Sequence, residues 1–205
     1  MRLFRFVSLA SVMLLAGFAS AQACLSNNTI ASAENSTVKL NPEITKTAPN
    51  QFNLVPATDH ISTQALLSAT DPNVGFCAEV EMLTTPTPND SGVGVIFWSA
   101  GNSNDDFYFL ELHDSGQYRV VHILFGRWYT LLPFTASAAI KQGLNQVNEV
   151  EVWRTTTGAN IFINGQKVNQ IIAQPSDAGQ YFGPFGESPK AGPATMQVGS
   201  LRLVK

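Results

Sequence analysis

From residue 52 onward the chain alternates apolar and polar residues, and turn-forming residues interrupt the alternation at intervals of roughly 8–12 positions. Successive side chains of a β-strand point to opposite faces, so a period of two is typical of half-buried strands. Many short strands at even spacing indicate an all-β sandwich or barrel. At 205 residues the chain is long enough for one sizeable core and short for two.

No internal repeat and no second hydrophobic pattern suggests another domain, so we predict one folded domain over residues 51–205. Residues 24–50 are rich in Ser, Thr, Asn and Pro and are expected to form an irregular leader or an early edge segment. The predicted strands are Phe52–Val55, His60–Leu67, Gly75–Leu83, Gly92–Ser99, Phe107–His113, Gln117–Phe125, Trp128–Pro133, Asn148–Thr155, Asn160–Asn164, Gln166–Ala173, Tyr181–Gly186 and Met196–Val204.

Two tight turns predict hairpins. Asn164-Gly165 fits a two-residue type I′ turn, because both central residues of that turn need a positive φ. Asp114-Ser115-Gly116 separates two alternating runs. With Ser115 at the tip of that hairpin, Glu111 lies directly opposite Arg119 on one face. The other face carries an apolar set for the core.

The face with Glu111 and Arg119 also carries several aromatic residues, which is unusual for a solvated face. Alternation places Trp98 on an outward position of one neighbouring strand and Trp153 on an outward position of another. Trp128 follows a Gly-Arg turn and is expected at the rim. Sugar rings stack on aromatic rings while their hydroxyls need carboxylate, amide or guanidinium partners, so these residues predict a ligand platform. The alternative is that the aromatic residues pack beneath a loop.

The first 23 residues predict a secretory signal peptide. Arg2 and Arg5 precede an apolar run, and small residues around Ala21 offer two cleavage sites of the A-x-A type. The run is short for a spanning helix, although an amino-terminal membrane anchor is the alternative. We therefore expect a secreted or periplasmic protein.

Cys24 and Cys77 are the only two cysteines of the chain. An oxidising compartment favours a disulfide between them, which would tie the mature amino terminus to an internal strand. Two free thiols are one alternative. Lipidation of Cys24 is another, but the three residues before it, Ala-Gln-Ala, match a lipidation motif poorly.

Several short motifs occur in an order that resembles the concanavalin A-like lectin/glucanase superfamily, in its laminin-G-like and 3-keto-disaccharide hydrolase-like branch. The resemblance covers roughly residues 75–204. It implies a jelly-roll of two antiparallel sheets that binds sugars or other ligands on one face. The motifs are the strand Gly94–Trp98, the hairpin Phe107–Tyr118, the turn Gly126–Trp128 and the hairpin Ile163–Val168.

Two departures from that family pattern put in doubt any recognition through the usual arginine and any catalysis of the glucanase type. Trp98 stands where the family usually has an arginine, and the acidic catalytic strand of the glucanases (Glu-x-Asp-x-x-Glu) is absent. Two pairs of glutamates nevertheless share a strand face at i,i+2 spacing, which places them about 7 Å apart and within the range of glycosidase carboxylates. Acids alternating on a solvent-facing strand are the simpler explanation. These pairs are Glu79 with Glu81 and Glu149 with Glu151.

Other chemistries find little support. The three histidines have no metal-binding spacing, and no G-x-S-x-G elbow is present. A turn over residues 102–106 is rich in Asn and Asp and is the one candidate for Ca²⁺. A polar turn is the alternative. We otherwise expect no cofactor. The pI of about 5.5 and the lack of a basic patch argue against nucleic acid.

Three functions remain open. The first is noncovalent binding of carbohydrate or another extracellular ligand through Trp98, Glu111, Arg119, Trp153 and Trp128. The second is a glycoside hydrolase or lyase acting on a modified disaccharide, with Glu79, Glu81 or Glu111 as acid or base. The third is an envelope protein whose aromatic face contacts another protein.

Overall fold

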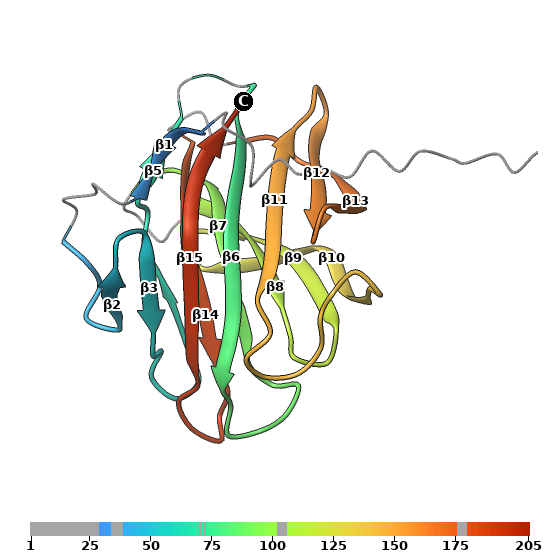
Figure 1. Ribbon diagram of the computed structural model, residues 1–205. Coiled ribbons are helices and arrows are strands. Elements are labelled where there is room, and N and C mark those ends of the chain that lie inside the picture. The colour runs from blue at the N-terminus through green and yellow to red at the C-terminus, as the bar shows by residue number, and fades with distance from the viewer. Residues whose placement is uncertain (1–28, 34–38, 70, 72, 102–105, 176–179) are drawn as a thin grey trace, which may run out of the picture.

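The structure is a computed structural model that describes residues 29–33, 39–69, 71, 73–101, 106–175 and 180–205. Two antiparallel sheets pack face to face as a sandwich (Figure 1). The predicted all-β, two-sheet jelly-roll sandwich is therefore confirmed. Within the described ranges, no helix is long and apolar enough to cross a membrane.

The first sheet, called sheet A here, has the strand order β13-β12-β11-β6-β15-β3-β2, and β1 pairs with β15 (Figure 1). Its strands are β1 (Thr29–Ser32), β2 (Ile44–Ala48), β3 (Gln51–Leu54), β6 (Gly75–Thr84), β11 (Asn148–Arg154), β12 (Gly158–Ile163), β13 (Gln166–Ile172) and β15 (Thr195–Val204). β1 and β2 both come from the region 24–50, and β2 forms one edge of the sheet.

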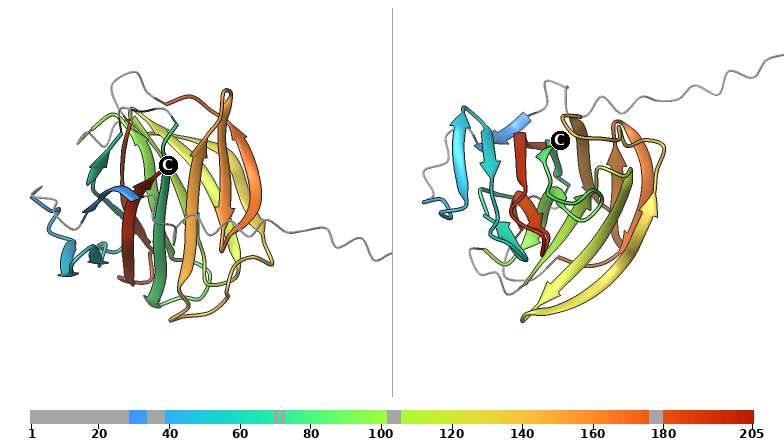
Figure 2. Two further views of the ribbon diagram at one scale, coloured as in Figure 1. Left: turned by 45° about the horizontal axis from the view of Figure 1, so that its top comes forward. Right: turned by 90° about the horizontal axis from the view of Figure 1, so that it is seen from below.

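The second sheet, sheet B, has the order β10-β9-β8-β7-β14-β4, and β5 pairs with β14. Figure 2 shows the two sheets as separate layers. The strands of sheet B are β4 (His60–Thr63), β5 (Leu67–Ser68), β7 (Gly92–Ser99), β8 (Asp106–Leu112), β9 (Gln117–Leu124), β10 (Arg127–Ala136) and β14 (Tyr181–Ser188). The predicted strand His60–Leu67 is thus two short strands, β4 and β5.

The main core fills the space between the sheets, and it is built from the inward positions of the alternating strands. Phe52 and Phe76 of sheet A and Phe97 and Leu110 of sheet B are each at most 1% exposed. Burial of such apolar surface stabilises the fold by about 25 cal/mol per Å². The outward positions of both sheets are consequently set by the same alternation.

Both predicted hairpins are confirmed, and the first has the predicted register. Glu111 pairs with Arg119, and the remaining pairs of β8 and β9 follow the same register. At the second turn Asn164 has φ 48° and Gly165 has φ 75°. The two positive values fit the type I′ geometry that Asn-Gly favours, because these residues tolerate the left-handed region.

The predicted outward position of Trp98 is wrong. Trp98 is 2% exposed and belongs to the main core, where its ring contacts Phe97 and Tyr108 edge-on. Its φ of 53° breaks the two-residue alternation of β7, and the pairing with β14 is irregular at this point. Phe97 and Trp98 therefore both point inward, as neighbouring residues do at a bulge.

Candidate ligand-binding site

The outer face of sheet B, which points away from the main core, carries a second apolar cluster. Its side chains are nearly inaccessible to solvent although they lie on the outside of the sandwich. A solvated sheet face normally alternates to polar residues at these positions. The cluster consists of Ile96, Phe107, Phe109, Val121, Ile123 and Phe185.

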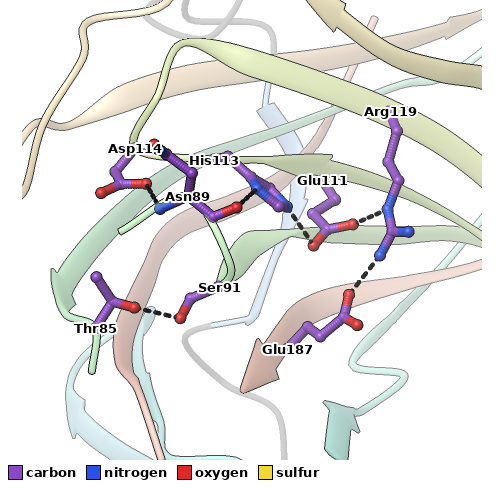
Figure 3. Close-up of polar contacts among 8 residues, drawn as sticks. All are labelled: Thr85, Asn89, Ser91, Glu111, His113, Asp114, Arg119 and Glu187. Atoms are coloured by element: carbon purple, nitrogen blue, oxygen red, sulfur yellow. Dashed lines mark hydrogen bonds and ion pairs between the residues drawn. The ribbon is translucent and has the colours of Figure 1, made fainter. Parts of the chain in front are cut away.

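A charged network lies beside this cluster and is drawn in Figure 3. The Nε of Arg119, on β9, donates to Glu111 Oε2, on β8. The Nη2 of the same guanidinium donates to Glu187 Oε2, on β14, at 2.5 Å. The Glu111 side chain is fully buried, whereas Arg119 and Glu187 are 17% and 27% exposed. One arginine thus joins two carboxyl groups across sheet B.

Gly92 makes room for this arrangement. It lies on β7 opposite Glu187, between the strands that carry the two glutamates. A Cβ at this position would stand 1.6 Å from Glu111 Oε1, so any side chain would displace the carboxylate. The glycine is therefore required by the close approach of Glu111.

His113 contacts the second carboxylate oxygen of Glu111. Its Nε2 lies 3.0 Å from Glu111 Oε1, and its Nδ1 lies 3.1 Å from the carbonyl oxygen of Asn89. A carbonyl oxygen can only accept, so Nδ1 carries a proton. The contact between Nε2 and Oε1, drawn in Figure 3, also needs a proton. His113 and Glu111 therefore form a pair that shares this proton and has no net charge.

Aromatic side chains from the edge strand β10 flank the guanidinium. The Arg119 Cζ lies 4.6 Å from the ring centre of Phe134 and 5.5 Å from that of Trp128. Trp128 is 46% and Phe134 is 42% exposed, so each presents ring surface to solvent. Trp128 also packs edge-on against Phe109, which fixes its position.

The two carboxyl groups have pKa values shifted in opposite directions. Burial, followed by the charge of Glu111, raises the pKa of Glu187 to about 8. Burial also acts to raise the pKa of Glu111, but the hydrogen bond from His113 and the charge of Arg119 outweigh it and lower that pKa. At neutral pH the network therefore contains one ionised and one protonated glutamate.

The structure unites three of the five predicted ligand-binding residues on this face: Glu111, Arg119 and Trp128. Glu187, His113 and Phe134 were missed. The predicted strand Tyr181–Gly186 ended one residue before Glu187. Alternation with Phe185, which points to the same face, could have found it.

The prediction that Trp153 shares this face is wrong. Trp153 is on β11 of sheet A, where it packs against Cys77 and Val204 on the outer face of that sheet. Its indole lies over Gly75, and its Nε1 donates to Glu151 Oε2 at 2.7 Å. Trp153 therefore lies on the opposite side of the sandwich from Arg119.

The predicted carboxylate pairs also lie on the outer face of sheet A. Glu79 pairs with Glu149 across strands, and Glu79 Oε2 accepts a hydrogen bond from Ser200 at 2.7 Å. Burial, followed by the charge of Glu151, raises the pKa of Glu149 to about 7. No group of three or more His, Cys, Asp or Glu side chains among the described residues could hold a metal ion.

Two further predictions involve residues outside the described part of the chain. Cys24 lies outside it, so the pairing with Cys77 stays a prediction; Cys77 itself is fully buried. Residues 102–105 of the candidate Ca²⁺ turn also lie outside it. Asp106 is described, and its Oδ1 is 2.8 Å from His122 Nε2.

Comparison with solved structures defines the class of fold. The structure is similar to that of the carbohydrate-binding module CBM66 of Bacillus subtilis, with TM-score 0.59, 11% identity and coverage of 85% of this chain and 94% of that chain. It is also similar to a β-glucanase of Bacillus licheniformis, with TM-score 0.54, 10% identity and coverage of 83% and 88%.

A third similar structure is the carbohydrate recognition domain of Emp46p, with TM-score 0.55, 10% identity and coverage of 86% of this chain and 95% of that one. No protein-family model and no curated protein matches the sequence. The protein has a concanavalin A-like jelly-roll fold, as the sequence resemblance implied. At such low identity the likeness extends to the fold alone.

Proposed function

We propose that this protein binds carbohydrate noncovalently on the outer face of sheet B. The observation that carries the proposal is the position of two half-exposed aromatic rings, Trp128 and Phe134, whose centres lie 5.5 Å and 4.6 Å from the Arg119 Cζ. Ring faces stack on the C–H groups of a sugar. The adjacent guanidinium and the Glu187 carboxyl group supply hydrogen bonds to its hydroxyls.

The site is held rigidly enough for recognition. Arg119 is fixed by two carboxyl groups, and Glu111 is fixed in turn by His113. A guanidinium that is already oriented loses little conformational entropy when a ligand binds. The names of two similar folds, a carbohydrate-binding module and a carbohydrate recognition domain, point in the same direction.

Export is part of the same proposal. A signal peptide over residues 1–23 would deliver the protein to an oxidising compartment, either secreted or periplasmic, where Cys24 and Cys77 form a disulfide. Polysaccharides outside the cytoplasm are then available to the site.

Replacing Trp128 or Phe134 by Ala tests the binding site. We expect a roughly 5- to 30-fold loss of affinity on a glycan array or in affinity electrophoresis, since stacking on an aromatic ring contributes about 1–2 kcal/mol. Phe125→Ala is the matched control: Phe125 is an aromatic residue next to β10 that is 78% exposed. Both site variants should keep the wild-type melting temperature.

Unchanged glycan binding by Trp128→Ala and Phe134→Ala would reject this site. Capture of a specific protein partner, with no glycan bound by the wild type, would instead favour an envelope protein with an aromatic contact face.

The pKa values of Glu187 and Glu111 are shifted in opposite directions, which favours a second candidate function, the cleavage of a glycoside. Acid and base roles are typically divided between two carboxyl groups whose environments separate their pKa values. Protonated Glu187, which is 27% exposed, would be the acid, whereas the fully buried Glu111 would act only by raising the pKa of Glu187. Incubation with simple glycans and keto-disaccharides, followed by product analysis, separates this candidate from binding alone. Products that disappear in Glu187→Gln would establish it.

A further inference from the structure

The charges of the network do not cancel at neutral pH. His113 and Glu111 share one proton and are together neutral, as the hydrogen bonds of His113 require. Burial and the charge of Glu111 keep Glu187 protonated, with a pKa of about 8. The network of these four residues therefore carries one net positive charge at neutral pH, although Arg119 is ion-paired with Glu111.

One nitrogen of that guanidinium is also without a partner. Nε and Nη2 bind the two glutamates, whereas Nη1 has no hydrogen-bond partner among the described residues. Figure 3 shows Nη1 pointing away from both carboxyl groups. The Arg119 side chain is 17% exposed, and the rings of Trp128 and Phe134 lie within 5.5 Å of its Cζ.

We propose that the ligand of this site is an acidic saccharide, whose carboxylate or sulfate group binds Nη1 of Arg119. The inference rests on the proposed carbohydrate binding and narrows its ligand class. A negatively charged group would complete the charge balance, because charge-assisted hydrogen bonds to guanidinium are about twice as strong as neutral ones. The aromatic rings would hold the sugar ring beside it.

Glu187 would then regulate binding. The charged groups that face it are Glu111 on β8 and Arg119 on β9, while β7 and β4 present Gly92 and Ile61 at the paired positions. A protonated Glu187 can donate to the ligand's anionic group, whereas an ionised Glu187 would repel it. Binding should therefore weaken as the pH rises above neutrality.

The test compares oligosaccharides of equal length by isothermal titration calorimetry with the full mature protein. The probes are an oligogalacturonate, a sulfated galactan fragment and a neutral β-glucan fragment. We expect at least one acidic probe to bind tenfold or more tightly than the neutral one. The better of the two acidic probes identifies a carboxylate or a sulfate as the anionic group.

Variants separate a specific contact from general charge attraction. Arg119→Lys keeps the charge but removes the fork of donors, and we expect a tenfold or greater loss of affinity for the acidic probe. Lys167→Gln removes one exposed cation from sheet A and should leave the affinity for the acidic probe unchanged. The Glu187→Gln variant should bind the acidic probe with equal affinity at pH 7 and pH 9.5. The affinity of the wild type should fall about tenfold over the same range.

Each outcome decides the inference. Equal or tighter binding of the neutral fragment would overturn the acidic ligand and leave carbohydrate binding intact. No binding of any saccharide would overturn both. Wild-type affinity that rises with pH would refute the role of Glu187.

Discussion

Arg119 shows how one side chain can organise a face built from several strands. Its guanidinium contacts carboxyl groups of β8 and β14, which are separated by β7 in sheet B. Buried ion pairs gain little net stability because desolvation offsets the attraction. We therefore interpret this network as a device that positions the donor atoms of Arg119, rather than as a major source of stability.

Glu187 should make the stability of the protein depend on pH. Its pKa is about 8 in the folded protein and near 4.5 when unfolded, so the folded state binds the proton more tightly. The free energy of unfolding should then fall as the pH rises from about 5 to about 8. Glu187→Gln should remove roughly 2–4 kcal/mol of that fall, as measured by urea denaturation at several pH values.

The range from about pH 7 to about pH 8 is the most informative, because Glu149, with a pKa of about 7, contributes mainly at lower pH. Glu81→Gln, which removes a carboxylate from sheet A, is the control and should keep the wild-type profile. A Glu187→Gln profile that matches the wild type would show that Glu187 ionises equally well in both states.

At the scale of single elements, the turn between β12 and β13 links two parts of sheet A. The Nδ2 of Asn164 donates to the Ala139 carbonyl oxygen at 2.8 Å and to Asn148 Oδ1 at 2.7 Å. Its Oδ1 accepts from the Glu149 backbone N–H at 2.9 Å. One turn residue thus fixes the start of β11 as well as its own hairpin.

Asn164→Ala should therefore destabilise the protein by about 2–4 kcal/mol. The change removes three hydrogen bonds and places Ala at φ 48°, which costs about 1 kcal/mol by itself. Chemical denaturation would measure the loss. Gln166→Ala, an exposed change two residues away, should stay within about 0.5 kcal/mol of the wild type. A similar value for both variants would contradict the role of Asn164.

Alternation and turn chemistry predicted most strands and the register of the β8–β9 hairpin, because both depend on local sequence. They placed Glu111 opposite Arg119 correctly. Trp98 was misplaced because a single residue with φ 53° changes the phase of a strand. Such a bulge depends on the pairing with β14, which is far away in the sequence.

At the scale of the whole molecule, alternation cannot tell to which sheet a strand belongs. Trp153 points outward as predicted, but β11 lies beside β6 in sheet A rather than beside the strands of Arg119. Glu187 reaches the site through the pairing of β14 with β7. A local sequence pattern cannot predict contacts between residues that meet only through such long-range strand pairings.

The disulfide predicted between Cys24 and Cys77 also acts on the whole molecule. It would close a loop of about 50 residues, and in the chain-entropy model its reduction costs roughly 4 kcal/mol. We expect dithiothreitol or Cys24→Ser to lower the melting temperature markedly. Alkylation of the unreduced, denatured mature protein should label neither cysteine, and labelling of both would refute the disulfide.

The edge position of β10 has a consequence for ligand binding. β10 pairs with β9 alone in sheet B, and it carries both Trp128 and Phe134. A terminal strand opens more readily than a central one, so its amide protons should exchange quickly in the free protein. A sugar held between the two rings should slow that exchange along β10 and leave β7 unchanged. Deuterium uptake would then report an occupied site independently of the heat of binding.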